Sequence, residues 1–394
     1  MNAGRGTSIF QNGLVWFGAA VSIAEIQTGI DIAAGGGGSG IDVATAAWAI
    51  IAGHLLGGLL LFAVGCIGAR LRASAMDCVK LPFGRAGAGL LAALNIVQLL
   101  GWTAVMIAQG AEAASALVPR LAFPAASAII GVLVAAWVFI GLGGVSRINA
   151  VAMALLFILT LYLTFNLFTP DVKAAAGESA TSFWPIFEFS AAMPLSWLPL
   201  VADYTKDARR PRLAPAVSAA VYTLVSCWMF AIGVSVGRHF AGEGFAQAIL
   251  ACGAGAAGIF VVVFSTVTTT FLDAYSAGES ARSIHAKVPP KLFAVAVTAA
   301  GTLVAIFVGM DRYLDFLYLI ASVFAPMAAV QVVDWGLRAG ARSTGQVAIN
   351  FIAWLVGLAV YHVALAKGCP VGATLPSMIS AAAITALARL TTKH

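Results

Sequence analysis

The sequence predicts an all-α protein that crosses a membrane many times. Of its 394 residues, 61% are hydrophobic and only 10% are charged, and the mean hydropathy is +0.96. Apolar stretches of about 20 residues, the length that spans a bilayer as a helix, recur along the whole chain. A water-soluble core of this size could not bury so much apolar surface, so we expect most of the chain to lie in lipid.

We expect twelve spanning helices, with both termini in the cytoplasm. The basic residues decide the orientation, because cytoplasmic loops carry an excess of Lys and Arg. With the N-terminus inside, 17 of the 22 Lys and Arg residues fall on the cytoplasmic side and 5 fall outside. The net charge of +6 then faces anionic lipid and needs no nucleic acid to explain it. The expected spans are 11–34, 44–69, 86–117, 124–144, 148–169, 182–203, 213–236, 247–275, 291–310, 313–334, 346–366 and 371–390.

The first and sixth expected spans are predicted to be broken helices. The first contains the string GAAVSIAE, which sets small residues, a hydroxyl and Glu25 at mid-membrane, and the sixth contains Pro194 and Pro199, which each remove a backbone donor. Unwound backbone at this depth is tolerated only where it lines a cavity, although the prolines could instead merely kink a packed helix. One break in each half predicts two inverted repeats of five helices, with a solute site at the bilayer midplane. The expected repeats are residues 1–169 and 182–334, and residues 346–394 add two C-terminal helices.

Five carboxylates fall within the apolar runs, where a charged group is costly unless it faces a partner, a ligand or water. They therefore mark a candidate solute pathway. We expect Glu188 to lie near the outer interface, and Asp203, just before a basic inner loop, to act in gating. Asp273 is a second candidate for a gating or proton-linked role. The five are Glu25, Glu112, Glu188, Asp203 and Asp273.

The third expected span presents a polar and aromatic stripe. Its members fall on one face of a helix, which should turn toward the pathway or the bundle rather than toward lipid. Trp102 is suited to stacking on a planar aromatic solute, with Trp197 as a candidate on the opposite side. Ordinary packing is the other interpretation of a tryptophan in a membrane helix. The stripe consists of Asn95, Gln98, Trp102, Gln109 and Glu112.

The eighth expected span carries an unusual set of hydroxyls. Its string FSTVTTTFLDAY places Thr266, Thr269, Thr270 and Asp273 on one helical face. Sodium takes oxygen ligands, so paired hydroxyls opposite the freed carbonyls of a broken first span would form a small-cation site. The alternative is that these hydroxyls donate hydrogen bonds to carbonyls of their own helix.

Three strings resemble the nucleobase–cation symporter-1 family, and most closely its hydroxymethylpyrimidine transporter (CytX) branch. They are SIFQNGLVWFGAAVSIAEI, KLPFGRAGAGLLAALNIVQLLGWTAVMI and LSWLPLVADYTKDARRP, and the resemblance extends over the whole chain. It implies a LeuT-type fold and inward transport of a thiamine-precursor pyrimidine across the cytoplasmic (inner) membrane of a bacterium. The driving force implied is a cation gradient, with Na⁺ as the coupling ion. The family's aromatic stacking position falls on Trp102, and a second one matches Trp197 approximately.

The resemblance also implies a sodium site. Its ligands would be backbone carbonyls of the first span and paired hydroxyls of the eighth, at Ala20, Ile23, Ser265 and Thr266. The chain departs from the family pattern at Met106, where relatives that handle hydantoins carry Gln, and it lacks the usual Asn further along the eighth span. The recognised solute should therefore differ from theirs.

The solute chemistry can also be argued from the residues. An aminopyrimidine presents a flat ring, an amine donor and ring nitrogen acceptors, so its site needs aromatic faces and a carboxylate or amide. Glu25, beside the first break, is the first choice for this edge. The expected substrate-binding residues are Glu25, Asn95, Gln98, Trp102, Met106 and Trp197.

Two alternatives stay open at this point. A proton-coupled carrier of cytosine or another nucleobase would use Glu25 or Asp273 as its titrating group. A membrane enzyme is disfavoured, because the five His and five Cys residues are dispersed without nucleophile, metal or disulfide spacing, so no catalytic residue is expected. No cofactor is expected apart from the coupling ion. The oligomeric state is open, and a monomer is plausible.

Overall fold

The structure is a computed structural model that describes residues 6–35, 41–167, 182–240, 245–251, 253, 255–337 and 343–391. Within its helices, the side chains of residues 141–150, 152, 153, 167, 248, 265 and 268 lie outside this description. In the described part of the chain, the β-type pairing is limited to one isolated bridge between Thr7 and Ala208. The expected all-α class is therefore confirmed.

The first expected span consists of two helices, α1 (Ile9–Ala20) and α2 (Ile23–Gly35), and the pair is bent by 44°. Val21 lies between them and leaves the helical region, with φ −80° and ψ 83°. The backbone N–H of Ala24 donates to the Ser22 hydroxyl at 3.1 Å. Among the described residues, no backbone hydrogen bond runs from α2 back to α1. The predicted break is confirmed, and it leaves carbonyls of the last turn of α1 outside the helical ladder.

The sixth expected span is interrupted more mildly, between α6 (Phe183–Ser196) and α7 (Leu198–Thr205). Trp197 at the junction keeps right-handed helical geometry, with φ −89° and ψ −10°. The turn is tightened there, because the Leu200 N–H donates to the Trp197 carbonyl, three residues back, at 3.0 Å. Pro199, which has no N–H, stands in the first turn of α7, where that loss costs least. The predicted interruption is present, but the backbone is not unwound.

The remaining described helices largely match the expected spans. In the described part of the chain, nine helices are long and apolar enough to cross a membrane, or ten if the bent pair counts as one span. α14 is not among them, so the count of twelve stays a prediction. The helices are α3 (Val43–Leu71), α4 (Ala75–Leu117), α8 (Leu213–His239), α9 (Phe245–Ala251), α10 (Gly255–Ile284), α11 (Pro290–Val308), α12 (Tyr313–Gly336), α13 (Thr344–Ala366) and α14 (Thr374–Thr391).

One continuous helix takes the place of the fourth and fifth expected spans. α5 runs over Phe123–Leu167, 45 residues, where a short loop was expected between residues 144 and 148. At about 1.5 Å per residue, a helix of this length is about twice as long as a hydrocarbon core of about 30 Å is thick. The intervening string GLGGVSRIN contains no proline, so no residue in it prevents helical hydrogen bonding. The predicted loop is therefore helical.

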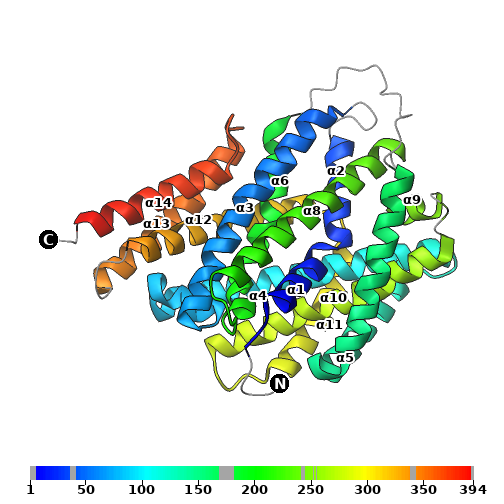
Figure 1. The fold of residues 1–394 in the computed structure, drawn as a ribbon, viewed down its shortest axis with the longest axis horizontal. Coiled ribbons are helices and arrows are strands. Elements are labelled where there is room, and N and C mark those ends of the chain that lie inside the picture. The colour runs from blue at the N-terminus through cyan, green and yellow to red at the C-terminus, as the bar shows by residue number, and fades with distance from the viewer. Residues whose placement is uncertain are drawn as a thin grey trace.

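The helices pack in two groups. The first group contains α1, α2, α3, α6, α7 and α8, and the second contains α4, α5, α10 and α11. In Figure 1, α3, α6 and α8 occupy the upper centre, while α10, α11 and α5 lie below them. α12 packs against α6 and also contacts α13 and α14, which lie at the left of the view. Segments from distant parts of the sequence are thus brought together between the two groups.

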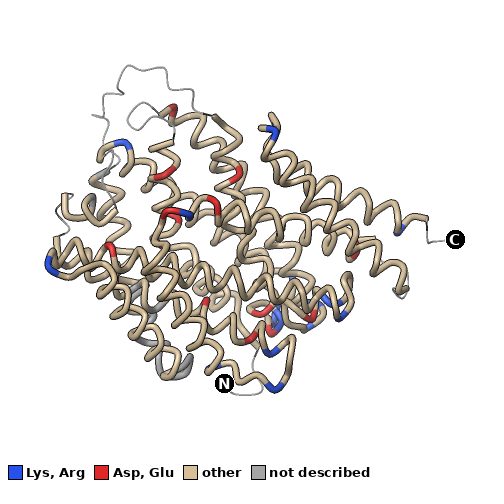
Figure 2. The backbone as a smooth tube through the Cα atoms, turned by 180° about the vertical axis from the view of Figure 1, so that it is seen from behind, with Lys and Arg blue, Asp and Glu red and all other residues tan. Residues whose placement is uncertain are grey.

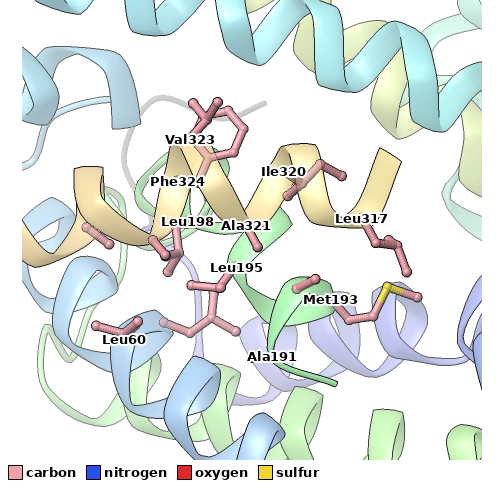
Figure 3. Packing of buried hydrophobic residues seen from close by; sticks show 14 of the residues in the cluster. Leu60, Ala191, Met193, Leu195, Leu198, Leu317, Ile320, Ala321, Val323 and Phe324 are labelled. Carbon is pink, nitrogen blue, oxygen red and sulfur yellow. The ribbon is translucent and has the colours of Figure 1, made fainter. Parts of the chain in front are cut away.

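Apolar packing joins α12 to the first group. Figure 3 shows Met193 and Leu195 of α6 facing Leu317 and Ala321 of α12, with Leu60 of α3 beside them. All five side chains are buried. In lipid, such packing stabilises through close van der Waals contact, because apolar surface is not removed from water. These contacts place α6 between α3 and α12.

Buried hydrogen bonds from polar side chains join the C-terminal helices α13 and α14 to α12 and α4. Arg389 of α14 donates from Nε to Asp334 Oδ1 of α12 at 2.9 Å, and both side chains are buried. Asn350 of α13 donates to the same carboxylate oxygen and to the carbonyl of Pro82, each at 3.0 Å. Because the buried guanidinium and carboxylate are paired with each other, and Asn350 donates to the carboxylate, the burial of these polar groups is tolerated.

Glu188 is a structural anchor, and its expected place near the outer interface stays a prediction. Its side chain is only 3% exposed. The carboxylate accepts from the backbone N–H groups of Ala373 and Thr374 at 2.8 and 3.0 Å, and from the Tyr361 hydroxyl at 3.3 Å. It thereby caps the start of α14 and joins that helix to α6.

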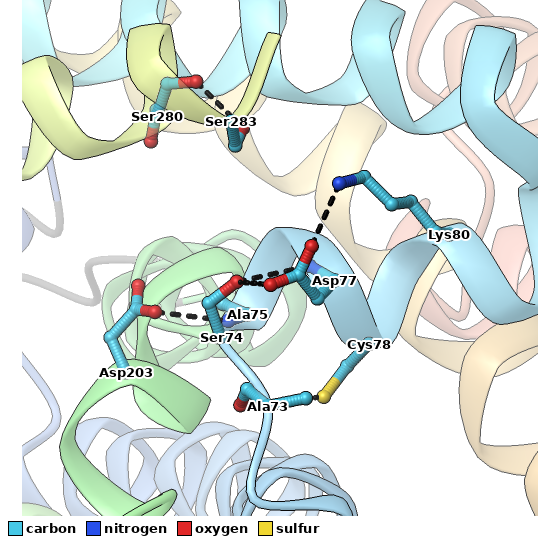
Figure 4. Close-up of polar contacts among 9 residues, drawn as sticks. All are labelled: Ala73, Ser74, Ala75, Asp77, Cys78, Lys80, Asp203, Ser280 and Ser283. Atoms are coloured by element: carbon cyan, nitrogen blue, oxygen red, sulfur yellow. Dashed lines mark hydrogen bonds and ion pairs between the residues drawn. The ribbon is translucent and has the colours of Figure 1, made fainter. Parts of the chain in front are cut away.

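A cluster of Lys and Arg, with some Asp and Glu, lies at the end of the molecule where the N-terminus is, while other acidic residues lie on helices farther from it (Figure 2). Thr7 pairs there with the segment after α7, through Thr7 N–H to the Asp207 carbonyl at 2.8 Å and Arg209 N–H to the Thr7 carbonyl at 3.1 Å. At the same end, Asp203 of α7 accepts from the backbone N–H of Ala75 at 3.0 Å, which joins α7 to the start of α4 (Figure 4). The N-terminal segment therefore lies on the same side as the loop after the sixth expected span.

Candidate functional site: a cavity between the two helix groups

A cavity lies where the break between α1 and α2 faces the junction of α6 and α7. Its walls come from these two interrupted spans, from α8, and from α4 and α10 of the second group. The space available to the centre of a water molecule is about 40 Å³. Since one ordered water needs about 10–15 Å³ by this measure, the cavity holds a few waters or, after small side-chain movements, one small ring.

A chain of hydrogen bonds crosses one wall of the cavity. Trp197 donates from Nε1 to the Tyr222 hydroxyl at 3.1 Å, and this hydroxyl donates to Glu25 Oε1 at 3.2 Å. Glu25 stands in the first turn of α2, where the helix dipole favours a negative charge. Its other oxygen, Oε2, is buried and has no hydrogen-bond partner among the described residues. An acceptor is thus held in place for a solute donor.

Asp273 of α10 brings a second carboxylate to the same cavity, and Thr269 lies one turn before it. Among the described residues, Asp273 has no hydrogen-bond partner. None of the lining residues, all within the described part of the chain, is Lys, Arg or His. The cavity is therefore acidic.

Trp102 and Met106 of α4 form the opposite wall. Trp102 is 8% exposed and meets Phe316 and Tyr313 of α12 edge to face, with ring centroids 5.4 and 6.3 Å apart. Tyr313 in turn donates to the Ala24 carbonyl at 3.0 Å, so the aromatic wall is tied to the start of α2. Such contacts hold the indole in one orientation while its cavity side remains free for a planar solute.

Asn95 and Gln98 are buried but do not line the cavity. Gln98 donates to the Ser196 carbonyl at 2.7 Å and to Asn95 Oδ1 at 2.9 Å, while Asn95 donates to Ser280 of α10 at 2.9 Å. In an uninterrupted helix the Ser196 carbonyl would accept from Leu200. Gln98 therefore satisfies the acceptor that the interruption frees, which is a positioning role.

The predicted sodium ligands come from two places, the break between α1 and α2 and the middle of α10. Ala20 and Ile23 are buried on either side of the first break. Thr266 donates to the Val262 carbonyl of its own helix at 2.9 Å, and its side chain packs near Gly110 of α4. The side chain of Ser265 lies outside the described residues. The alternative expected for the hydroxyls, bonding to their own helix, is what Thr266 and Thr270 show.

The two carboxylates predicted to act in gating occupy different places. Asp273 faces the cavity, whereas Asp203 lies outside it, in contact with the start of α4. Glu112, on the predicted stripe of α4, is exposed and does not line the cavity. Of the five residues of the predicted stripe, only Trp102 therefore lines the cavity.

Four polar cavity residues were not singled out from the sequence as site residues: Ser22, Ser196, Tyr222 and Thr269. Tyr222 carried a usable signal, because a tyrosine within an apolar span needs a partner for its hydroxyl. Thr269 belonged to the hydroxyl face of the eighth span but was assigned to no role. Ser22 belonged to the string that predicted the first break.

The fold matches known cation-coupled transporters. The inward-facing structure of Mhp1 superposes with a TM-score of 0.77 at 20% identity, covering 98% of this chain and 91% of that one. Mhp1, a nucleobase-cation-symport-1 family transporter, in a closed conformation with bromovinylhydantoin bound gives 0.74 at 21% identity, with 98% and 92% covered. A Na⁺-coupled sialic acid symporter gives 0.63 at 14% identity, with 97% of each chain covered. The expected LeuT-type fold is thus confirmed. No protein-family model and no curated protein matches the sequence.

Proposed function

We propose that this multi-pass membrane protein is a secondary transporter that imports a pyrimidine, hydroxymethylpyrimidine, together with a cation. The observation that carries the proposal is the cavity, which lies between the two interrupted spans and is faced by Trp102 and Trp197. Tryptophan faces suit a planar ring, and interrupted spans at membrane depth are where secondary transporters of this architecture hold their solute. The likeness to Mhp1 supports a site of this kind.

Several parts of the proposal follow from the sequence. We assign the protein to the nucleobase–cation symporter-1 family and place it in the cytoplasmic membrane of a bacterium, with both termini inside. We also retain the two inverted repeats, residues 1–169 and 182–334, with the C-terminal helices of residues 346–394 outside the repeats. The buried anchor at Glu188 and the Asp334–Arg389 pair join those last helices to the transport core.

Transport in proteoliposomes tests the function. Purified protein is reconstituted, and uptake of labelled hydroxymethylpyrimidine is followed with an inward gradient of Na⁺, of protons, or of neither. We expect accumulation above the outside concentration only with a cation gradient, and competition by other small pyrimidines. Chemical analysis of the recovered solute checks that it is unchanged, as a carrier requires. Uptake that only equilibrates under every gradient, or a modified solute, would contradict the proposal.

Sodium coupling predicts the behaviour of a double variant. If the hydroxyls of Ser265 and Thr266 join the carbonyls at the first break around Na⁺, Ser265→Ala combined with Thr266→Ala should raise the sodium concentration needed for half-maximal uptake. Each lost oxygen ligand weakens cation binding, so we expect a shift of roughly tenfold or more, equivalent to about 1.4 kcal/mol. Measuring uptake over a series of sodium concentrations checks this. An unchanged sodium dependence would rule out these hydroxyls as ligands.

Proton coupling is a second candidate, and the two cavity carboxylates favour it. Glu25 and Asp273 could carry the coupled proton, in a carrier of cytosine or another nucleobase, without any sodium site. The geometry of Thr266, whose hydroxyl is occupied by its own helix, also fits this alternative. Uptake that requires a pH gradient and ignores sodium would select it.

A further inference from the structure

Two carboxylates share the cavity, and no basic group neutralises them there. Glu25 comes from the first turn of α2 and Asp273 from the middle of α10, so they approach from different helix groups. Both line the same space, and each lies within electrostatic reach of the other. Among the described residues that line the cavity, the other polar groups are hydroxyls and indoles.

The groups around each carboxylate are also uncharged or acidic. Glu25 is faced by Tyr222 of α8, by Tyr313 of α12 and by Asp273, and Asp31 lies farther along its own helix. Asp273 is faced by Tyr204 of α7, near which Asp203 also lies. Tyr222 satisfies one oxygen of Glu25, and Oε2, on a side chain only 3% exposed, has no partner in the described chain. Glu25 therefore has a free acceptor oxygen, and among the described residues that line the cavity no positive charge neutralises the two carboxylates.

Two carboxylates in one cavity favour a positively charged ligand over a neutral or negative one. Two ionised carboxylates in a site of low dielectric repel each other, and each lacks the water that would stabilise it outside the membrane. A ligand with a positive charge and several N–H donors relieves both costs. An aminopyrimidine protonated on its ring shares the positive charge with its exocyclic amine, whose N–H groups then donate charge-assisted hydrogen bonds to carboxylates.

We propose, on the basis of the pyrimidine transport argued above, that Glu25 and Asp273 bind the solute as an aminopyrimidinium cation. Glu25 accepts from the exocyclic amine through its unpartnered oxygen, and Asp273 supplies a second negative charge that offsets the positive charge of the ring. Trp102 and Trp197 then border a cationic ring, which an indole face attracts. A pyrimidine with an oxo group in place of the amine presents an acceptor to these carboxylates and is rejected.

Calorimetric titration of the full-length protein in detergent tests the charge of the bound solute. Three ligands of nearly equal shape are compared: 4-aminopyrimidine, 4-pyrimidinone and 4-amino-1-methylpyrimidinium, whose charge is fixed. We expect the fixed cation to bind without proton uptake, and 4-aminopyrimidine to bind with uptake of one proton from the buffer. Above the pKa of the free ligand, the affinity for 4-aminopyrimidine should fall about tenfold per pH unit relative to that for the fixed cation. 4-Pyrimidinone should bind at least roughly 30-fold more weakly, as expected when a buried charge loses its partner.

Two variants assign the effect to the pair. Glu25→Gln and Asp273→Asn keep the size of each side chain but remove a negative charge, so each should reduce the preference for the fixed cation over 4-pyrimidinone by roughly tenfold or more. Glu112→Gln, on the exposed part of α4, is the matched control and should leave the preference unchanged. If a cavity variant fails to fold, the three-ligand comparison on the unmodified protein still decides the question.

The outcomes separate this inference from the proposed function. Equal binding of 4-pyrimidinone and 4-aminopyrimidine, or binding of 4-aminopyrimidine without proton uptake, would overturn the cationic solute while leaving pyrimidine transport intact. Unaltered preference in both cavity variants would overturn the role of the pair. Absence of binding for every pyrimidine, together with absence of uptake in proteoliposomes, would overturn the proposed function itself.

Discussion

Trp102→Ala should abolish measurable pyrimidine binding. The indole forms the wall of the cavity on the α4 side and is held edge to face against Phe316 and Tyr313. Loss of an aromatic face on which a base stacks costs about 1–3 kcal/mol, a factor of roughly 5 to 150 in affinity. Loss of the indole also leaves the two α12 rings free to move into the site, which adds to the effect. Titration calorimetry with hydroxymethylpyrimidine measures the change.

The control variants separate binding from folding. Removal of a buried Trp destabilises by about 3–5 kcal/mol, so Trp102→Phe is needed as a milder change that keeps an aromatic face. We expect Trp102→Phe to fold and to bind more weakly, but measurably. Trp48→Ala, on the part of α3 where the side chain is 68% exposed, should leave binding unchanged. Binding that survives Trp102→Ala at full strength would show that the solute does not lie against this wall.

Gly233→Ala should strongly destabilise the fold, and Gly29→Ala should do the same. The two glycines face each other where α2 crosses α8, and a Cβ on Gly233 would collide with the backbone carbonyl of Ile26, while one on Gly29 would collide with that of Phe230. Backbone cannot yield as a flexible side chain does, so the helices must separate, at a cost of about 1–3 kcal/mol or more. Separation also pulls Tyr222 away from Glu25. Thermal unfolding in detergent, together with solute affinity, measures both consequences.

A double variant and a distant glycine sharpen this test. Because the two substitutions relieve the same contact, combining them should destabilise by much less than the sum of the single effects. Gly89→Ala, at a helical position of α4 where an added Cβ meets no atom within 4 Å, is the control. It should be neutral or slightly stabilising, by up to about 1 kcal/mol, since alanine favours helix over glycine. Additive losses, or an equal loss at Gly89, would show that the α2–α8 contact is not the cause.

The site residues show which parts of a binding site a sequence pattern can predict. Trp102 and Glu25, predicted to bind the substrate, both line the cavity, and each was noticed because a mid-span tryptophan and a carboxylate beside a broken helix are unusual on their own. Asn95 and Gln98 share the face of Trp102, yet they do not line the cavity: Gln98 donates to the Ser196 carbonyl at the interruption, and Asn95 donates to Ser280 of α10. Helical periodicity tells which residues share a face, but a face several turns long meets different neighbours at each turn.

The sequence by itself determined the helical class, the membrane as solvent and the break in the first span. These depend on local properties: the length of an apolar run, the absence of water for backbone groups, and small residues beside a carboxylate. The same local reasoning predicted an interruption near Pro199. It did not predict that the backbone there stays nearly helical, because this depends on distant partners such as Gln98 and on how α6 packs against α12.

Only the tertiary structure decided that Glu25 and Asp273 share one cavity, that Glu188 anchors α14, and that the Thr266 hydroxyl turns to its own helix. Each depends on the rotation of a helix about its axis and on partners up to hundreds of residues away in the chain. In a bilayer, small residues and polar contacts such as Gly29 against Gly233 set that rotation, because apolar side chains are as well solvated by lipid as by each other. A pattern of hydrophobicity therefore specifies that a helix spans, while packing specifies which of its faces meets the solute.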